Sequence, residues 1–156
     1  MINKIIIKIL FVFFILKFGI SPIAIKTEIV NAIAYTDPEE ISYYSTLEND
    51  FNEYAENNNL DTKFQITILT PLNSTRSLED FDSLMDSLLL KKSKKYDIYF
   101  YYGLSVAKYG KYFLPLNDKI EPDYLEDFDN NVIQYTCMYN DNLIGLVINI
   151  LLILHN

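Results

Sequence analysis

Strand-like runs and amphipathic stretches alternate through the middle of this chain, and the alternation constrains the fold more than any other feature. Residues 27–35 and 97–101 are short apolar runs, as expected of buried strands. Residues 63–70 alternate apolar and polar side chains, which is typical of a strand with one wetter face at a sheet edge. The order β-α-β-α-β-α predicts an α/β fold with a three-layer, doubly wound and mostly parallel sheet.

Helix start and stop patterns separate these strands. After the first strand, Asp37 is expected to cap a helix that starts at Pro38, with Glu40 completing a capping box. This helix is expected to end at the asparagines of residues 57–59, which tolerate a left-handed turn.

Two further helices are expected later in the chain. One starts at Ser77 and ends at lysines whose positive charge complements the helix dipole: Lys91, Lys92, Lys94 and Lys95. A short helix over residues 104–109 is expected to close at Gly110. Farther on, residues 139–142 predict a tight turn between two short strands. The apolar stretch over residues 143–154 is too short to span a bilayer and predicts a buried strand.

The first 20 residues have the pattern of a secretory signal. Lys4 and Lys8 precede an apolar run over residues 9–16, and small residues follow. An uncleaved membrane anchor is the alternative. We therefore divide the chain into residues 1–25, a signal peptide or membrane anchor, and residues 26–156, an incomplete lobe that is secreted or lies on the extracellular face of the plasma membrane. Asn73 begins an N-glycosylation triplet, Asn73-Ser74-Thr75, which agrees with secretion.

Charge and residue usage argue against several functions. The chain has 13 basic and 21 acidic residues, and without the three lysines of residues 1–25 the net charge falls from −8 to −11. Such a domain is expected to repel nucleic acid and anionic membrane surfaces. His155 is the single histidine and lies one residue from the C-terminus, so we expect neither a histidine-based triad nor a multi-histidine metal site. Asp127-x-Asp129-x-Asn131 lacks the glycine and glutamate of a calcium loop. Cys137, the single cysteine, is expected to be a small buried residue. We therefore expect no enzyme activity, cofactor or metal.

Two corners of the predicted sheet combine aromatic and polar groups. Tyr35, Thr36 and Asp37 follow the first strand, and Tyr101, Tyr102 and Gly103 follow the third. The carboxyl ends of parallel strands meet at one edge of a sheet, where open α/β folds bind ligands. Tyrosine rings stack on sugars, and a carboxylate fixes hydroxyl groups. These six residues are the predicted ligand-binding site; helix capping and rim packing are the alternative roles.

Four segments, in this order and spacing, resemble the N-terminal lobe of extracellular solute-binding proteins of the periplasmic-binding-protein type II class that serve sugar and oligosaccharide importers. The segments are Asn31-Ala-Ile-Ala-Tyr35-Thr-Asp-Pro-Glu-Glu40, Tyr96-Asp-Ile-Tyr-Phe-Tyr-Tyr-Gly-Leu-Ser105, Lys111-Tyr-Phe-Leu-Pro-Leu-Asn-Asp118 and Tyr139-Asn-Asp-Asn-Leu-Ile-Gly145. The similarity covers residues 27–150.

The resemblance implies binding of a small polar solute, such as a sugar, between two lobes without catalysis, with the two corners facing the ligand. The sequence ends where that family's chain enters its second lobe, which indicates a fragment of a longer protein or a degenerate copy. The alternatives are a ligand-sensing ectodomain fragment of a membrane receptor and a membrane-tethered protein that binds no ligand. A sheet without its returning neighbours is also expected to expose an apolar edge and to self-associate.

Overall fold

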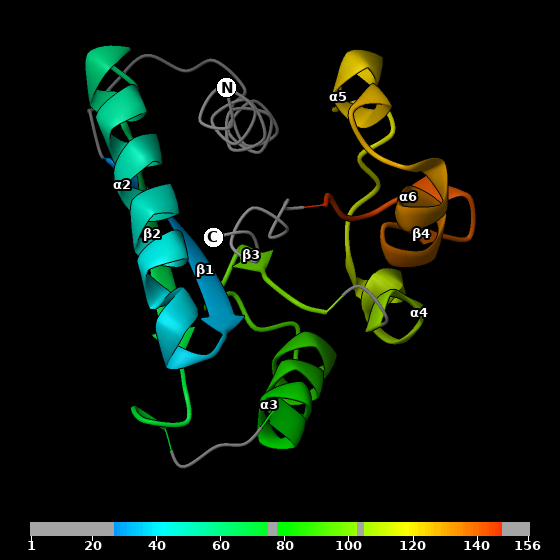
Figure 1. The fold of residues 1–156 in the computed structure, drawn as a ribbon, viewed down its shortest axis with the longest axis horizontal. Coiled ribbons are helices and arrows are strands. Elements are labelled where there is room, and N and C mark those ends of the chain that lie inside the picture. Colours follow the sequence, from blue (N-terminus) through cyan, green and yellow to red (C-terminus); the bar gives the residue numbers. More distant parts are fainter. Residues whose placement is uncertain (1–26, 75–77, 103–104, 148–156) are drawn as a thin grey trace. The chain divides into compact units, whose positions relative to one another are not determined.

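The computed structural model describes residues 27–74, 78–102 and 105–147. The chain forms two compact units, of which the first extends to Tyr101 and the second begins at Tyr102 (Figure 1). In the first unit, helices accompany a three-stranded parallel sheet, so the expected α/β class is confirmed.

The sheet of the first unit has β1 (Glu28–Tyr35) at its centre, between β2 (Thr62–Leu69) and β3 (Ile98–Tyr99). The register of β1 with β2 runs from the pair Glu28↔Thr62 to the pair Tyr35↔Leu69. The predicted first strand is confirmed, and so is the edge position of the second strand within the described sheet.

The third strand differs from its prediction, because it is two residues long and half-buried where a buried five-residue strand was expected. The hydrogen bonds of Asp97 explain why the strand starts one residue later than predicted. Its Oδ2 accepts the Asn31 N–H at 3.0 Å, while its own N–H donates to the Asn31 carbonyl at 2.7 Å. The Asp97 carboxylate thus accepts the Asn31 N–H, which a backbone carbonyl would accept in a regular parallel ladder. The regular pairing of β1 with β3 therefore starts only at Ile98.

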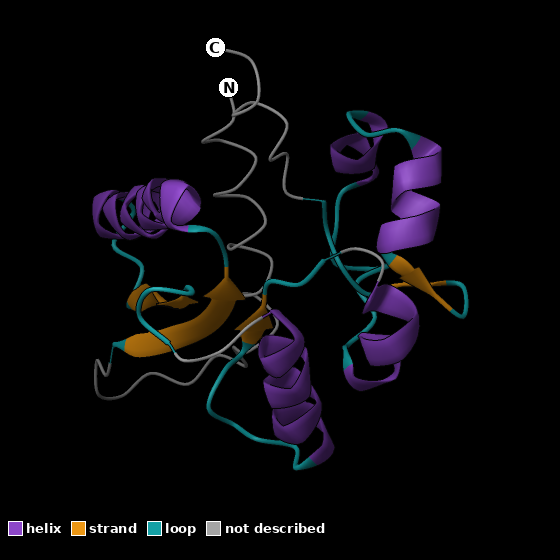
Figure 2. Ribbon diagram, turned by 60° about the horizontal axis from the view of Figure 1, so that its bottom comes forward, coloured by secondary structure: helices purple, strands orange, loops and turns teal. Residues whose placement is uncertain are grey.

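Helices cover opposite faces of the sheet (Figure 2). On one face, α2 (Ile41–Asn57), which follows the short η1 (Pro38–Glu40), packs on alternate residues of β1 and β2. That core contains Val30, Ala32, Ala34, Tyr44, Leu47, Phe51, Ala55, Phe64 and Ile66. On the other face, Tyr35 stacks on Phe81 of α3 (Leu78–Leu90). Because successive side chains of β1 point to opposite faces of the sheet, the strand contributes side chains to the packing on both faces.

Side chains cover the outer edge of β2. Asn52 of α2 accepts the Phe64 N–H at 2.8 Å through Oδ1 and donates to the Phe64 carbonyl at 2.9 Å through Nδ2. One turn earlier, Glu48 accepts the Ile66 N–H at 2.8 Å. Asn73 donates to the Ile68 carbonyl at 2.9 Å and accepts the Thr70 N–H at 2.8 Å. These bonds satisfy groups that would otherwise pair with another chain, so the expected self-association through an open edge has no support at β2.

The end of α2 agrees with its sequence prediction more closely than the end of α3 does. Asn59 has a φ of 53°, which confirms the left-handed stop expected after α2. The lysines expected to end α3 lie beyond it, with none in its last turn. Lys92 has a φ of 50°, its N–H donates to the Leu89 carbonyl, and the Ser93 N–H donates to the Leu88 carbonyl. This pair of bonds is a Schellman motif. The predicted cap Ser77 lies outside the described residues.

Within residues 105–147, the second unit contains four short helices and a hairpin. Its helices are α4 (Val106–Tyr109), η3 (Gly110–Tyr112), α5 (Pro122–Glu126) and α6 (Asn130–Thr136). The hairpin pairs β4 (Met138–Tyr139) with β5 (Asn142–Leu143), and Asn140 and Asp141 have φ values of 48° and 62°. The predicted tight turn is confirmed, since two left-handed residues in succession are typical of a type I′ turn.

The prediction that Gly110 closes the helix ending at residue 109 is confirmed, since α4 ends at Tyr109 and Gly110 is its C-cap. Gly110 has a helical backbone and not a left-handed one, so the chain continues into η3. Its lack of a side chain matters instead, since an added Cβ would lie 2.5 Å from Tyr139 Cβ. The helices α5 and α6 were not expected. The strand predicted over residues 143–154 ends at Leu143 in the described part, and residues 148–156 lie outside it.

Candidate functional site

The strand order β2-β1-β3 places a topological switch point between β1 and β3. The chain leaves the carboxyl end of β1 toward α2 and β2, then returns through α3 to β3 on the other side of β1. In open α/β sheets, ligands bind beyond the carboxyl ends of the strands at such a point. We call the residues that follow β1 and β3 there, Tyr35 to Asp37 and Phe100 with Tyr101, the switch-point edge.

The register brings the two predicted corners to the same level. Ile33 pairs with Tyr99, and the Phe100 N–H donates to the Ile33 carbonyl at 2.9 Å. Tyr35 and Tyr101 each lie two residues beyond that pair, Tyr35 as the last residue of β1 and Tyr101 past the end of β3. Within the first unit, the structure therefore brings Tyr35, Thr36, Asp37 and Tyr101 to one edge.

Thr36 is buried and stabilises the turn after β1 through hydrogen bonds. It is 1% exposed, its N–H donates to the Leu69 carbonyl at 3.0 Å, and its hydroxyl donates to the Glu40 carboxylate. The expected capping box is therefore wrong, because Glu40 accepts the Thr36 hydroxyl and the Asp37 side chain makes no capping bond. In this conformation Thr36 positions the corner, and its contact with a ligand stays a prediction.

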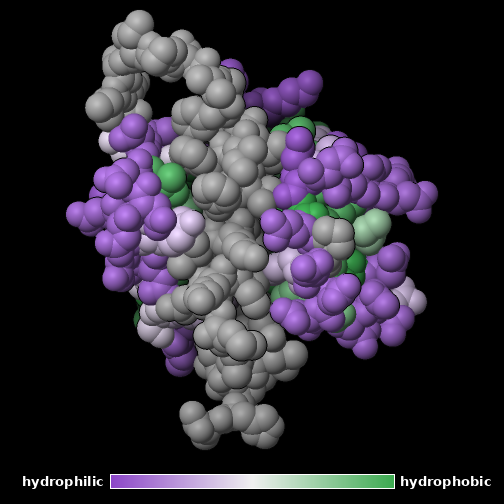
Figure 3. Space-filling view, turned by 90° about the horizontal axis from the view of Figure 1, so that it is seen from above, coloured by the Kyte–Doolittle hydropathy of each residue, from purple (hydrophilic) through white to green (hydrophobic). Residues whose placement is uncertain are grey.

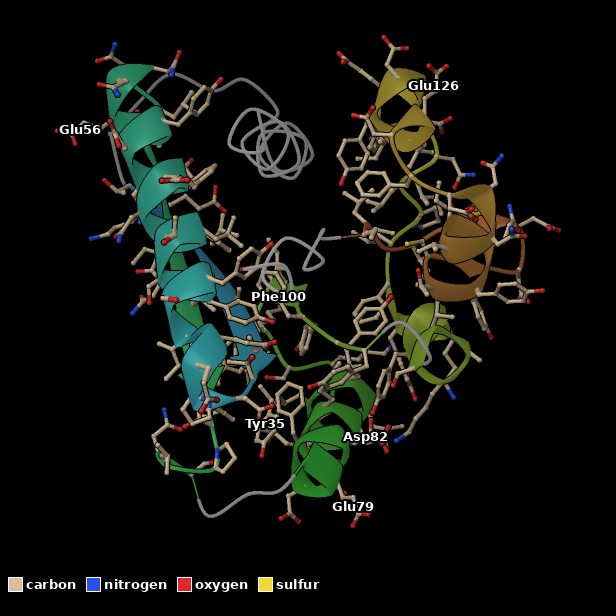
Figure 4. The ribbon with its side chains drawn as sticks, viewed as in Figure 1. Tyr35, Glu56, Glu79, Asp82, Phe100 and Glu126 are labelled. Carbon is tan, nitrogen blue, oxygen red and sulfur yellow. The ribbon has the colours of Figure 1, made fainter. Side chains whose placement is uncertain are left out.

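The Tyr35 ring is half-buried and stacks on Phe81, with ring centroids 5.6 Å apart and an interplanar angle of 29°. Figure 4 shows Tyr35 between the end of β1 and α3, at the opposite end of the first unit from Glu56. Asp37 is exposed, in an extended conformation, with its carbonyl accepting the Glu40 N–H at 3.0 Å. The corner therefore presents a supported ring beside an exposed carboxylate.

The end of β3 adds aromatic groups to the edge. The Phe100 ring meets Tyr44 of α2 edge to face, at a centroid distance of 5.3 Å, and Tyr101 after it is half-buried. Burial raises the pKa of Tyr99, and the neighbouring Tyr96 and Asp97 raise it further, so its phenol stays protonated and neutral well above neutral pH.

The remaining predicted contacts belong elsewhere. Tyr102 is 56% exposed and is the first residue of the second unit, where its carbonyl accepts the Ser105 N–H at 2.8 Å. Gly103 lies outside the described residues. The structure therefore does not place these two residues relative to the switch-point edge.

Asn73, the predicted glycosylation acceptor, is exposed but has a structural role. Its Nδ2, the atom that a glycan would modify, donates to the Ile68 carbonyl, and its Oδ1 accepts the Thr70 N–H. The amide thus extends the ladder past the end of β2, and its glycosylation stays a prediction.

Within residues 27–74, 78–102 and 105–147, no group of three or more His, Cys, Asp or Glu side chains is arranged to hold a metal ion. Asp129, part of the calcium-like pattern, caps α6 by accepting the Asn131 N–H at 2.7 Å. The prediction that Cys137 is a small buried residue is confirmed. Burial raises the pKa of its thiol, against a smaller lowering by the Thr136 hydroxyl.

Two residues that support the switch-point edge were not predicted in that role from the sequence. Glu40 supports the corner through Thr36, and Phe81 supports the Tyr35 ring. The four-residue spacing of Thr36 and Glu40 suits such a bond across a helix start, and Phe81 lies on the apolar stripe of α3. Neither pattern by itself distinguishes a supporting residue from ordinary capping or packing.

No protein-family model, curated protein or solved structure gives a significant match to this chain. Among the described helices, none is long and apolar enough to cross a membrane.

Proposed function

We propose that this protein binds a small polar solute, such as a sugar, at the switch-point edge, as one lobe of an extracellular solute-binding fold of the periplasmic-binding-protein type II class. The observation that carries the proposal is the strand order β2-β1-β3, which puts Tyr35, Asp37 and Tyr101 at the edge where open α/β sheets receive ligands. The proposal is binding without catalysis.

The side chains at the edge suit a sugar. The faces of Tyr35 and Tyr101 offer apolar surfaces for the C–H groups of a pyranose ring, and the exposed Asp37 carboxylate accepts hydrogen bonds from its hydroxyls. Phe81 and Glu40 keep this arrangement in place before the ligand arrives, which lowers the ordering cost of binding.

The test compares two double variants against glucose, maltose and maltotriose, with binding followed by saturation-transfer NMR. Asp37→Asn with Tyr101→Ala removes the edge, whereas Asp61→Asn with Tyr54→Ala makes the same chemical changes at an exposed and a half-buried position near the other end of the first unit. We expect the first variant to bind at least about tenfold more weakly, the effect of losing roughly 1.4 kcal/mol. Equal affinity of the two variants for a sugar that the unaltered protein binds would refute the site.

The resemblance to solute-binding proteins also suggests a contribution from Tyr102. A second comparison therefore sets Asp37→Asn with Tyr102→Ala against Asp37→Asn alone. Weaker binding by the double variant would support a ligand contact by Tyr102. Unchanged binding would remove Tyr102 from the proposed site.

A further inference from the structure

The segment after α3 concentrates positive charge on an acidic protein. Lys91, Lys92, Lys94 and Lys95 are all exposed and supply four of the 13 basic residues of the chain. Leu90, directly before them, is 65% exposed. In the view of Figure 3 the described surface is mainly hydrophilic, with small hydrophobic areas. Two other described leucines, Leu72 and Leu114, are more exposed, and of these three only Leu90 directly precedes a group of four lysines. We call residues 90–95 the lysine edge.

The helix terminus explains only part of this charge. Cations favour the last turn of a helix, and the effect fades beyond it. None of the four lysines lies in the last turn of α3, and Lys94 and Lys95 follow the Schellman motif that ends the helix. Four lysines past the last turn exceed what the helix dipole requires.

The backbone conformation of Lys92 is a second reason to assign a function to these lysines. Its φ of 50° is a left-handed conformation in which glycine is the usual residue. A side chain there costs about 1–2 kcal/mol per residue in backbone energy. Residues held in such conformations are concentrated at functional sites. A lysine at this position supplies one of the four charges, where a glycine would supply none.

The lysine edge lies where the chain enters the first unit. In a βαβ unit the helix ends at the amino edge of the sheet, so residues 91–97 are at the same edge as the start of β1. Two hydrogen bonds between Asp97 and Asn31 join these segments directly. The apolar run of residues 9–16 precedes β1 in the sequence by about a dozen residues, a reach of at most ~40 Å when extended.

We propose that the lysine edge binds the anionic headgroups of a lipid bilayer. The four ammonium groups meet lipid phosphates, while the exposed Leu90 enters the boundary between headgroups and acyl chains. Charge interactions are screened over about 8 Å in physiological salt, so the local lysines act even though the whole chain carries a net charge of −8. The acidic remainder is repelled and orients the lysine edge toward the surface.

The test uses the full chain and two variants of equal net charge. One replaces Lys91, Lys92, Lys94 and Lys95 by Gln, and its matched control replaces four exposed lysines elsewhere, namely Lys63, Lys108, Lys111 and Lys119. Binding is measured by co-sedimentation with vesicles of phosphatidylcholine alone or mixed with phosphatidylglycerol. Both variants keep residues 1–26, so any insertion of that segment is common to them.

We expect the first variant to lose at least about tenfold in partitioning onto the anionic vesicles and nothing on the neutral ones, with the loss disappearing in high salt. The control variant should lose much less. Equal losses in the two variants, or no loss in the first, would overturn the proposal. So would binding of the lysine edge to a soluble polyanion such as heparin without binding to the vesicles.

A second readout reports the position of Leu90. The chain contains no tryptophan, so Leu90→Trp introduces a single fluorophore at the lysine edge. We expect its emission to shift to the blue on anionic vesicles and not on neutral ones. A vesicle-bound protein with unchanged emission would show that another surface makes the contact.

Discussion

At the scale of single residues, several positions are explained by backbone geometry or burial and not by the pattern that first drew attention to them. Gly110 caps α4 as expected, but with a helical backbone, and its lack of a Cβ leaves room for Tyr139. Glu40 was expected to bond the backbone but accepts the Thr36 hydroxyl. Local sequence identified these positions, and the neighbours that they meet decided their roles.

Lys92→Gly is expected to stabilise the first unit by about 0.5–1 kcal/mol. Relief of the left-handed strain is worth about 1–2 kcal/mol, and glycine returns part of that through greater freedom of the unfolded chain. Urea unfolding measures the change. Lys91→Gly removes the same charge at a position without positive φ and should not stabilise; a similar gain in both variants would assign the effect to charge.

Because the Cys137 thiol is buried, we expect the free energy of unfolding to fall at alkaline pH. Burial raises its pKa above the ordinary 9.0, so the folded state holds the thiol proton more tightly than the unfolded state. The resulting stabilisation is fully present below pH 9.0 and is lost as pH rises through the folded pKa. The free energy of unfolding should therefore fall above pH 9.0, and thiolate absorbance should develop later than in the unfolded chain.

The control for this pH dependence is Cys137→Ala. Tyr43 and Tyr99 also have raised pKa values, but from 10.0, so their contribution follows at higher pH in both proteins. A variant with the same decline just above pH 9.0 as the unaltered protein would show that the thiol is not responsible.

At the scale of elements, the edge strand β2 is protected by helix side chains and not by another strand. Asn52 pairs with both backbone groups of Phe64, and Glu48 accepts the next outward N–H. Asn52 and Glu48 are four residues apart on α2, while Phe64 and Ile66 are two apart on β2. One helical turn and two strand residues cover similar lengths, about 6 and 6.6 Å, so the two repeats match.

Asn52→Ala is expected to lower the free energy of unfolding by about 1–3 kcal/mol, because it leaves the partly buried Phe64 N–H and carbonyl without these partners. It should also promote self-association by opening the strand edge. Urea unfolding and size-exclusion chromatography measure the two effects. The matched control is Asn58→Ala, whose amide donates only to the exposed Tyr54 carbonyl at the end of the same helix. Equal effects at both positions would contradict edge protection.

The contact between η3 and β4 predicts the effect of a side chain at residue 110. In Gly110→Ala the new Cβ would approach the Cβ of Tyr139 to 2.5 Å and Cδ2 to 2.7 Å, which forces the backbone or the ring to move. Such overpacking costs typically about 1–3 kcal/mol. Thermal unfolding measures the loss. Ala107→Ser enlarges an exposed side chain of α4 and should have little effect; a similarly small effect of Gly110→Ala would show that the contact yields easily.

At the scale of the whole molecule, the chain combines two compact units with an N-terminal segment that has the composition of a leader. The switch-point edge and the lysine edge lie at opposite edges of one sheet, because strands carry the first at their carboxyl ends and helices deliver the second to the amino ends. A ligand at one edge and a membrane at the other would therefore not compete for the same surface.

The leader-like composition of residues 1–25 predicts that the secreted protein is a shortened, cleaved product. If it is cleaved, the secreted chain begins near residues 22–27 and its net charge changes from −8 to −11, since three lysines are removed with no acidic residue. N-terminal sequencing of protein expressed in a secreting host measures the start. A product that begins at Met1 and stays with the membrane would support the anchor instead, and an intact mass without added hexoses would argue against glycosylation at Asn73.

The sequence by itself determined the order of strands and helices in the first unit, the tight turn at residues 139–142 and the burial of Cys137, because hydrophobic period and turn chemistry are local properties. Only the tertiary structure decided which strands are neighbours, which corners share an edge, and that α2 covers the edge of β2. These depend on pairing between residues far apart in the chain, such as Asn31 with Asp97 and Asn52 with Phe64. A local pattern carries no record of such partners, since the same asparagine serves equally as a cap, a turn residue or a substitute for a strand.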